Sequence, residues 1–419
     1  MDKRERGHRL RGSRMLPSEG SSESQMRFVG IDIGAEKHWV AMVGEEEEVK
    51  LKSTPFGEDA LGYTKLFEVL GTAADTMVAM EATGHYWKNL FAALVARGFG
   101  VALLNPLRTR RFAEEDLERT KTDSIDALGI ARFACQKRPA VARLADAELE
   151  ELRELVRLRD RLQQDFGDRI RQLHRLVDLG FPEFTRYVKD LSTERATSIL
   201  AEYPTAEAFR AVSIKRLARL RYDGQHRVGE ELARELLAAA KSSVGHHHGH
   251  PYRIQVRFIC QDLCTLRQRL GELDRDIEKT VDTNQLGRLL TTIDGIGSQT
   301  AAKILARVGD PAELRSSAAL ASFVGVVPAL RQSGKKQNKR APLTPHGDAT
   351  LRAALWMPTL AAVQRNAWLR DHYQRLRARG KLPKVALVAC MRKLLTAVYS
   401  VAKNRRPFVP QLATAEVPA

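Results

Sequence analysis

The first third of the chain alternates short apolar runs with amphipathic stretches. The run from 27 to 33 is apolar apart from Asp32, which is typical of a strand buried on both faces, and Gly34 then allows a turn into a second apolar run at 38–43. The pattern continues with a strand at 48–54, a helix at about 58–70, a strand at 76–81, a helix at about 84–97, a strand at 100–105 and helices to about 135. Three leading strands followed by alternating helix and strand predict an α/β domain.

The order of these elements indicates one particular α/β arrangement. Three antiparallel strands followed by crossover units are the core of the ribonuclease-H-like fold, which we therefore expect for residues 26–144. Residues 1–25 are polar, serine-rich and basic, and we expect a disordered arm there.

Beyond residue 144 the apolar period becomes helical. Apolar residues recur every three or four positions through 145–183 and again through 254–283, among dense charges. The two stretches predict long helices that form an antiparallel coiled coil, either for dimerisation or spacing or as a hairpin within one chain. A helical insert at 184–245 and a flexible histidine-rich link at 245–250 are expected between them, giving a coiled-coil region at 145–284.

The last predicted domain, 285–405, is mainly helical, with a tail at 406–419. Its segment 289–310 contains Ile-Asp-Gly-Ile-Gly and predicts a helix–hairpin–helix. Gly295 and Gly297 would allow the tight turn, and the N–H groups that begin the next helix would hold a DNA phosphate. A plain packing element is the alternative. A core helix and turn at 318–330, a polar loop, and helices at about 349–366, 369–379 and 384–403 follow.

Charge changes this picture of the last domain. The chain carries a net +17, and residues 327–410 hold 18 Lys and Arg against Asp348 and Asp371, a net of +16. Such an excess predicts a polyanion-binding surface, and Pro345 and Pro358 interrupt any membrane-surface helix. We expect no membrane-spanning run of about 18 apolar residues. Four cysteines without a CxxC pair favour a reducing, cytoplasmic setting.

Four acids stand at positions that favour chemistry. Asp32 lies in a buried strand, where a lone carboxylate is costly unless it is paired or binds a cation, and Glu81 ends a predicted central strand. Asp123 and Asp126 share one face of a predicted helix. Taken singly, Asp123 and Asp126 could be a helix cap and a first-turn acid, and Glu81 a surface acid. Together the four predict a site for Mg²⁺, whose ligands are oxygens and which supports phosphoryl transfer.

A second candidate group lies in the polar loop from Arg331 to Lys336. Ser333 stands there beside a glycine and several cations, where a hydroxyl could attack a phosphate and the cations could stabilise the charge that develops. An ordinary solvated loop serine is the alternative reading of this position.

At this point the chain resembles a known family, the DEDD-type insertion-sequence transposases, also described as RNA-guided (bridge-RNA) serine recombinases. The resemblance runs from about residue 27 to about 395. In the N-terminal part, which looks like a RuvC-like domain, it rests on VGIDIGAEKH, MEATGHYW, LLNP and KTDSIDA. In the C-terminal part it rests on IDGIG, ASFVGVVP, RQSGKK and HGDATLRAAL. The chain departs from the family at Asp294, where a proline is common, and in its long helical middle.

The resemblance implies roles that spacing alone does not give. It implies that Asp32, Glu81, Asp123 and Asp126 bind Mg²⁺ (or Mn²⁺) and that Ser333 forms a transient phosphoserine link to DNA. It implies a noncoding guide RNA, a dimer that pairs into a tetramer, and action at the bacterial nucleoid. We expect nucleic-acid contacts from the hairpin glycines and from the cations of the loop and the following helix, namely Gly295, Gly297, Arg331, Lys335, Lys336, Lys339, Arg340 and Arg352.

Three other functions fit parts of this pattern. A water-using, metal-dependent nuclease of the Holliday-junction-resolvase kind would use the four acids without Ser333. A sugar kinase or ATPase would use the first hairpin for phosphate, but a second glycine-rich phosphate hairpin is missing and the basic C-terminal region would have no role. A non-catalytic nucleic-acid-binding scaffold would use only the charge.

Overall fold

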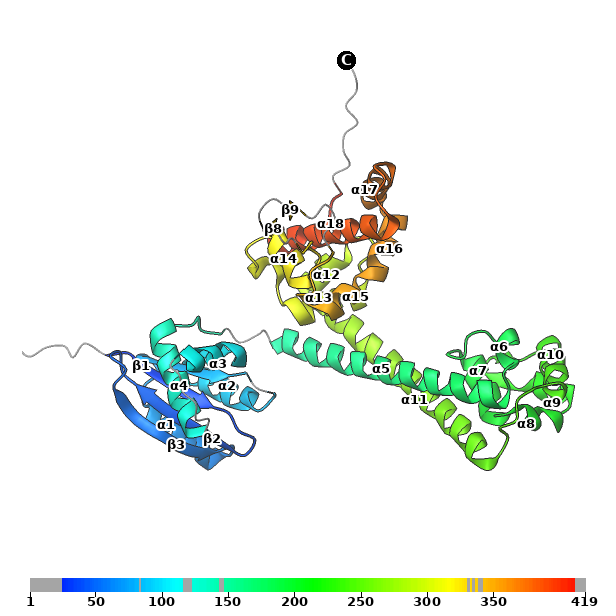
Figure 1. Cartoon of the computed structure of the whole chain (residues 1–419), viewed down its shortest axis with the longest axis horizontal. Coiled ribbons are helices and arrows are strands. Elements are labelled where there is room, and N and C mark those ends of the chain that lie inside the picture. The colour runs from blue at the N-terminus through cyan, green and yellow to red at the C-terminus, as the bar shows by residue number, and fades with distance from the viewer. Residues whose placement is uncertain are drawn as a thin grey trace, which may run out of the picture. The chain divides into compact units, whose positions relative to one another are not determined.

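The computed structural model describes residues 25–82, 84–115, 123–142, 147–329, 332–333, 336–337 and 342–410. The chain divides into two compact units, one ending at Leu144 and the other beginning at Ala145 (Figure 1). The predicted arm at 1–25 lies outside the described residues except for its last position, and so does the end of the predicted tail.

The first unit is built on a mixed five-stranded sheet. Its strands are β1 (Arg27–Asp32), β2 (Lys37–Val43), β3 (Val49–Gly57), β4 (Thr76–Glu81) and β5 (Gly100–Leu104). They lie in the order β3-β2-β1-β4-β5, with the first three antiparallel and β1, β4 and β5 parallel. This confirms the leading strands and the crossovers, and it is consistent with the ribonuclease-H-like prediction. β3 continues beyond residue 54, where its end was predicted, because Phe56 packs into the core.

Helices cover both faces of this sheet (Figure 1). α1 (Ala60–Leu70) and α2 (Trp87–Ala96) pack on one face, and α3 (Pro106–Glu115) and α4 (Asp123–Lys137) on the other. Within β1, Val29 and Ile31 belong to the core under α1 and α2, whereas Phe28 belongs to the core under α3 and α4. Both cores draw on β1, which explains why its sequence is a nearly continuous apolar run.

α4 lies directly on β1. A Cβ atom at Gly30 would stand 2.2 Å from the carbonyl oxygen of Ala127 and 2.3 Å from the backbone nitrogen of Ala131, so the position requires glycine. Near the other end of α4, the Cys135 thiol lies 3.5 Å from the carbonyl oxygen of Gly44, which follows the end of β2 that pairs with the beginning of β1. α4 therefore runs antiparallel to β1, and its first turn lies toward the C-terminal end of that strand.

The second unit begins with two long paired helices, α5 (Ala147–Gly180) and α11 (His250–Thr283). Arg169 forms an ion pair with Asp262, and Arg159 with Asp274, which shows that the helices are antiparallel. The pairing occurs within one chain, as in the hairpin alternative, and dimerisation stays a prediction. The apolar stripe of α11 is buried as expected, but Leu158 of α5 is 38% exposed.

The insert between these helices forms its own core (Figure 1). It contains α6 (Phe184–Tyr187), α7 (Glu194–Glu202), α8 (Ala206–Arg210), α9 (Ile214–Arg219), β6 (Arg221–Tyr222), β7 (His226–Arg227) and α10 (Glu230–Lys241). The histidine-rich link is packed against the end of α5, where a Cβ at Gly245 would lie 2.6 Å from the carbonyl oxygen of Gly180. A purely flexible link is therefore wrong for its first residue.

The rest of the second unit is helical around one core. It contains α12 (Gln285–Thr291), α13 (Ser298–Val308), a 3₁₀ turn (Pro311–Glu313), α14 (Ser317–Val324), β8 (Gln332–Ser333), β9 (Lys336–Gln337), α15 (Ala349–Ala354), α16 (Trp356–Arg365), α17 (Ala367–Ala378) and α18 (Pro383–Asn404). By length and composition α18 is apolar enough to cross a membrane, although Arg392 and Lys393 interrupt its apolar residues. Half of its apolar window is buried, and its side chains fill the centre of this core, as in a core helix.

Candidate active site

Asp32 and Glu81 meet at one edge of the sheet. Each is the last residue of its strand, and the parallel pairing of Ile31 with Met80 makes the two acids the next pair along the ladder. Alternation along the strands directs both side chains to the face covered by α3 and α4. The C-terminal edge of parallel strands is where α/β sheets bind ligands, so the structure brings these two predicted acids together at such an edge.

The other two acids begin α4. Asp123 is its first residue, and Asp126 is partly buried just before the turn of α4 that rests on Gly30. The antiparallel course of α4 places this beginning toward the end of β1 that carries Asp32. The side chain of Asp123 lies outside the described residues. Among the side chains that the structure describes, no group of three or more His, Cys, Asp or Glu is gathered closely enough to hold a metal ion.

A threonine that the sequence reasoning missed holds Glu81. The hydroxyl of Thr109, on α3, donates a short hydrogen bond to Oε1 of Glu81. Thr109 is 8% exposed, and the carbonyl oxygen of Pro106 lies 3.0 Å from the same hydroxyl. The sequence offers no signal for this contact, because it depends on how α3 packs across the end of the sheet.

Helix α3, which carries Thr109, also exposes three arginines, and an aromatic ring stands beside Asp32. Arg108, Arg110 and Arg111 are exposed on α3, beside the buried Thr109. Trp39 of β2 is paired with Asp32 across the antiparallel ladder, so its half-buried side chain lies on the same face as the carboxylate. Carboxylates for a hard cation, with an aromatic ring beside them and exposed arginines on the neighbouring helix, suit a phosphodiester substrate.

The donor set at this edge fits a divalent metal by its chemistry. Asp32 and Glu81 would supply oxygen ligands from adjacent positions, and Asp126 lies in the first turn of the neighbouring helix α4. Mg²⁺ takes such carboxylates and shares its remaining positions with water and substrate phosphate. The assignment of the metal to these residues stays a prediction.

The predicted nucleophile lies on a short hairpin of the second unit. β8 and β9 pair Ser333 with Lys336, and the base of the loop is closed by a bridge between Pro328 and Leu343. Side chains from 330 to 341 lie outside the described residues, which leaves untested the predicted roles of Ser333, Arg331, Lys335, Lys336, Lys339 and Arg340. Arg352 is described, is half-buried, and donates a hydrogen bond to the carbonyl oxygen of Val324 at 3.2 Å.

The two glycines of the predicted helix–hairpin–helix differ in their surroundings. Gly295 has φ +96°, and a Cβ there would lie 2.5 Å from Cβ of Ala362 and 2.8 Å from the carbonyl oxygen of Pro358. Gly297 precedes α13, and a Cβ there would meet nothing within 4 Å. Packing against α16 thus explains Gly295, whereas phosphate contact stays a prediction for Gly297.

Known proteins match this chain in sequence. Residues 29–182 match a family described as a transposase, the DEDD domain of IS110-type elements, and residues 287–374 match the transposase IS116/IS110/IS902 family. The "Insertion element IS116 uncharacterized 44.8 kDa protein" of Streptomyces clavuligerus is 27% identical over 394 residues, which are 91% of this chain and 96% of that protein. The "Pilin gene-inverting protein" of Moraxella bovis is 26% identical over 330 residues, 78% of this chain and 80% of that protein. The "Insertion element IS110 uncharacterized 43.6 kDa protein" of Streptomyces coelicolor is 26% identical over 387 residues, 90% and 94% of the two chains.

The two family matches, at opposite ends of the chain, define a transposase, an enzyme that transfers phosphoryl groups on DNA. Within that class, the chain belongs to the IS110/IS116 family, with a DEDD domain in its first part and the IS116/IS110/IS902 transposase domain in its second. The family suggested by the sequence motifs is therefore confirmed.

Proposed function

We propose that this transposase cuts and rejoins DNA through a phosphoserine link at Ser333. The Ser333 oxygen forms a bond to phosphorus, the bond from phosphorus to a deoxyribose oxygen breaks, and that oxygen leaves as a hydroxyl after taking up a proton. A hydroxyl of another strand then attacks the phosphoserine, which restores the serine and joins the strands. Because the phosphodiester is transferred to serine and not hydrolysed, its bond energy is retained, and strand exchange needs no added energy source.

The observation that supports metal-dependent phosphoryl transfer is the adjacency of Asp32 and Glu81 at the sheet edge, toward which α4 begins. We propose that these two acids hold Mg²⁺ or Mn²⁺ with Asp123 and Asp126. The metal would neutralise charge on the phosphate under attack and stabilise the leaving oxygen. The arginines on the neighbouring helix α3 would orient the DNA backbone at this edge.

Strand exchange, rather than hydrolysis, is supported by a relative. The Moraxella bovis protein is named for inverting a gene, and inversion requires that cut strands be rejoined. A covalent protein–DNA link keeps the energy of the broken phosphodiester for rejoining, whereas water would lose it. This favours the serine mechanism over the water-using nuclease.

We also propose a guide RNA and assembly of several copies. The net charge of +16 over 327–410 favours binding of the phosphate backbones of both DNA and RNA. The proposed acids and Ser333 lie in different units of the chain, so an acid site of one copy could serve Ser333 of another within a dimer or tetramer. Such an assembly would act on DNA of the bacterial nucleoid.

A trapping assay tests the serine mechanism. Purified protein with its co-purifying RNA, Mg²⁺ and labelled DNA from the ends of its own element is run on a denaturing gel. We expect a labelled band that migrates with the protein and disappears in Ser333→Ala, while Ser322→Ala, at an exposed serine of α14, retains it. Cut DNA without such a band would instead support the water-using nuclease.

A further inference from the structure

The second unit contains a cavity that the proposed reaction does not use. Its volume is about 530 Å³, within the range of sites for small ligands. Two of its lining residues, Val326 and Leu343, stand on the two sides of the loop that carries Ser333, and Leu343 forms the bridge that closes this loop. The cavity therefore opens beside the base of the Ser333 hairpin.

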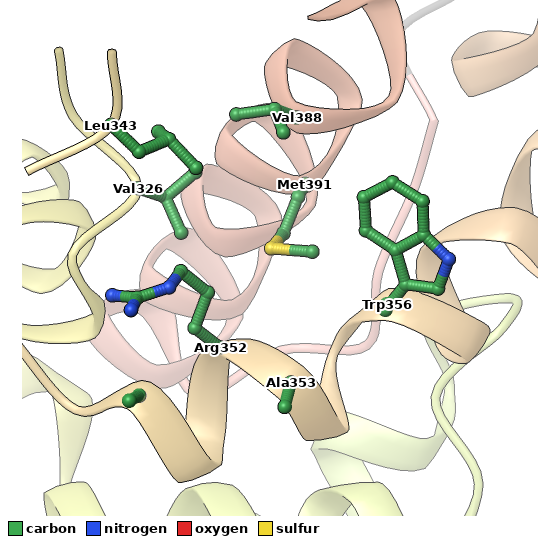
Figure 2. A pocket seen from close by; sticks show the side chains of 8 residues that line it. Val326, Leu343, Arg352, Ala353, Trp356, Val388 and Met391 are labelled. Carbon is green, nitrogen blue, oxygen red and sulfur yellow. The ribbon is translucent and has the colours of Figure 1, made fainter. Parts of the chain in front are cut away.

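The walls of the cavity combine apolar side chains with one cation and one aromatic ring (Figure 2). Arg352 of α15 and Trp356, which begins α16, both line the cavity; Arg352 lies near Val326, and Trp356 lies on the other side of Met391 (Figure 2). Val388 and Met391 of α18 face them. The hydrogen bond from Arg352 to Val324 uses one of five N–H groups and fixes the guanidinium at the wall.

This combination matches the chemistry of a nucleobase. A base has two apolar faces that stack on aromatic rings and a polar edge that accepts hydrogen bonds from a guanidinium. The surrounding charge attracts the backbone to which the base is attached, since Lys384 is exposed on α18 one turn before Val388. An uncharged apolar ligand would gain nothing from the net +16 of residues 327–410.

We propose that this cavity binds one unstacked base of the DNA strand that Ser333 attacks, within a few nucleotides of the reacting phosphate. The proposal rests on the proposed function, because it places the base beside the Ser333 hairpin. Holding one base outside the stack would fix the register of the strand at the reacting phosphate. The cost of unstacking would be offset by contact with Trp356 and the apolar walls.

The test measures binding without chemistry. Full-length Ser333→Ala protein, with its co-purifying RNA, is titrated with element-end DNA in which each nucleotide in turn is replaced by an abasic site. The same scan is repeated in proteins that also carry Trp356→Leu, Trp356→Phe or Val388→Phe. Met357→Ala is the matched control, because Met357 is 65% exposed and does not line the cavity.

We expect one position where the abasic site weakens binding about tenfold, the effect of losing one base–aromatic stack. In Trp356→Leu and in the cavity-filling Val388→Phe, the abasic site at that position should weaken DNA binding by less than about twofold. In Trp356→Phe and Met357→Ala it should weaken binding as much as in the parent protein. Equal abasic costs in all proteins would overturn the proposal. The Trp356 and Val388 substitutions could instead reduce the effect of an abasic site only when that site is in the RNA. This result would show that the cavity binds an RNA base, and it would also overturn the proposal. Since Ser333 is already replaced, a failure here is separate from a failure of the serine chemistry.

Discussion

Replacing Thr109 with valine removes one hydroxyl from Glu81 and leaves the volume of the side chain almost unchanged. Thr109 has a single hydroxyl hydrogen, and the charged carboxylate of Glu81 is a stronger acceptor than the nearby carbonyl of Pro106. Hydrogen bonds to charged groups contribute about 1.5–3 kcal/mol. Residues that orient a metal ligand change metal affinity by about 10- to 100-fold. Because Glu81 is partly exposed, water can replace part of the lost hydrogen bond. We therefore expect metal affinity to fall about tenfold, the lower end of that range.

The assay is a Mg²⁺ titration of adduct formation, with Mn²⁺ binding to the intact protein measured separately by electron paramagnetic resonance. In Thr109→Val both midpoints should rise about tenfold, whereas Thr109→Ser, which keeps the hydroxyl, should stay near wild type. Thr64→Val is the matched control, since the Thr64 hydroxyl bonds only within α1, to the carbonyl oxygen of Ala60, among the contacts that the structure describes. An unchanged metal midpoint in correctly folded Thr109→Val would refute the idea that Thr109 positions a metal ligand.

Three further predictions concern the fold and its thiols. Gly30→Ala forces a Cβ against α4 and should destabilise the protein by about 3 kcal/mol or prevent folding. Gly129→Ala, in open space on α4, should stabilise the protein by about 0.5–1 kcal/mol. Equal thermal melting midpoints for the two variants would contradict this prediction. Burial raises the pKa of the Cys260 thiol to about 12, whereas Cys264 is exposed. Iodoacetamide at pH 8 should therefore alkylate Cys264 and leave Cys260 unmodified. Equal labelling of the two cysteines, measured by mass spectrometry, would contradict the buried position of Cys260. Burial raises the pKa of Glu58, but hydrogen bonds from three side chains outweigh it and the net pKa is lowered. The folded pKa is below the unfolded one, so this carboxylate stabilises the protein above about pH 4.3, and the contribution is lost as pH falls further. Melting temperatures of Glu58→Gln should therefore fall less than those of wild type between pH 5 and pH 3.

The sheet and its edge acids could be predicted because local pattern decides them. Strand lengths follow from apolar runs, and the end of a strand fixes where its last side chain stands. Glu81 was expected at the end of such a run, whereas Asp32 was expected inside one. The structure ends β1 at Asp32, and the parallel pairing of β1 with β4 brings the two acids together at one edge. The family motifs added the likeness to transposases, which the comparisons confirm.

Other features depend on contacts between distant segments and gave no local signal. Thr109 reaches Glu81 only because α3 crosses the end of the sheet. Gly295 reads as part of a phosphate-binding turn, but its neighbour Ala362 comes from a helix far along the chain. The apolar length of α18 is the same whether a helix crosses a membrane or fills a core, and only the packing around it distinguishes the two.

The central claim is that Ser333 carries the DNA during strand exchange, and the most direct test is to locate the covalent bond. The trapped adduct is digested with nuclease and with trypsin, which cuts after Arg331 and Lys335, and the peptides are analysed by mass spectrometry. We predict that the peptide 332–335 carries the mass of a nucleotide on Ser333. A nucleotide on another residue, or cut DNA with every peptide unmodified, would contradict the account.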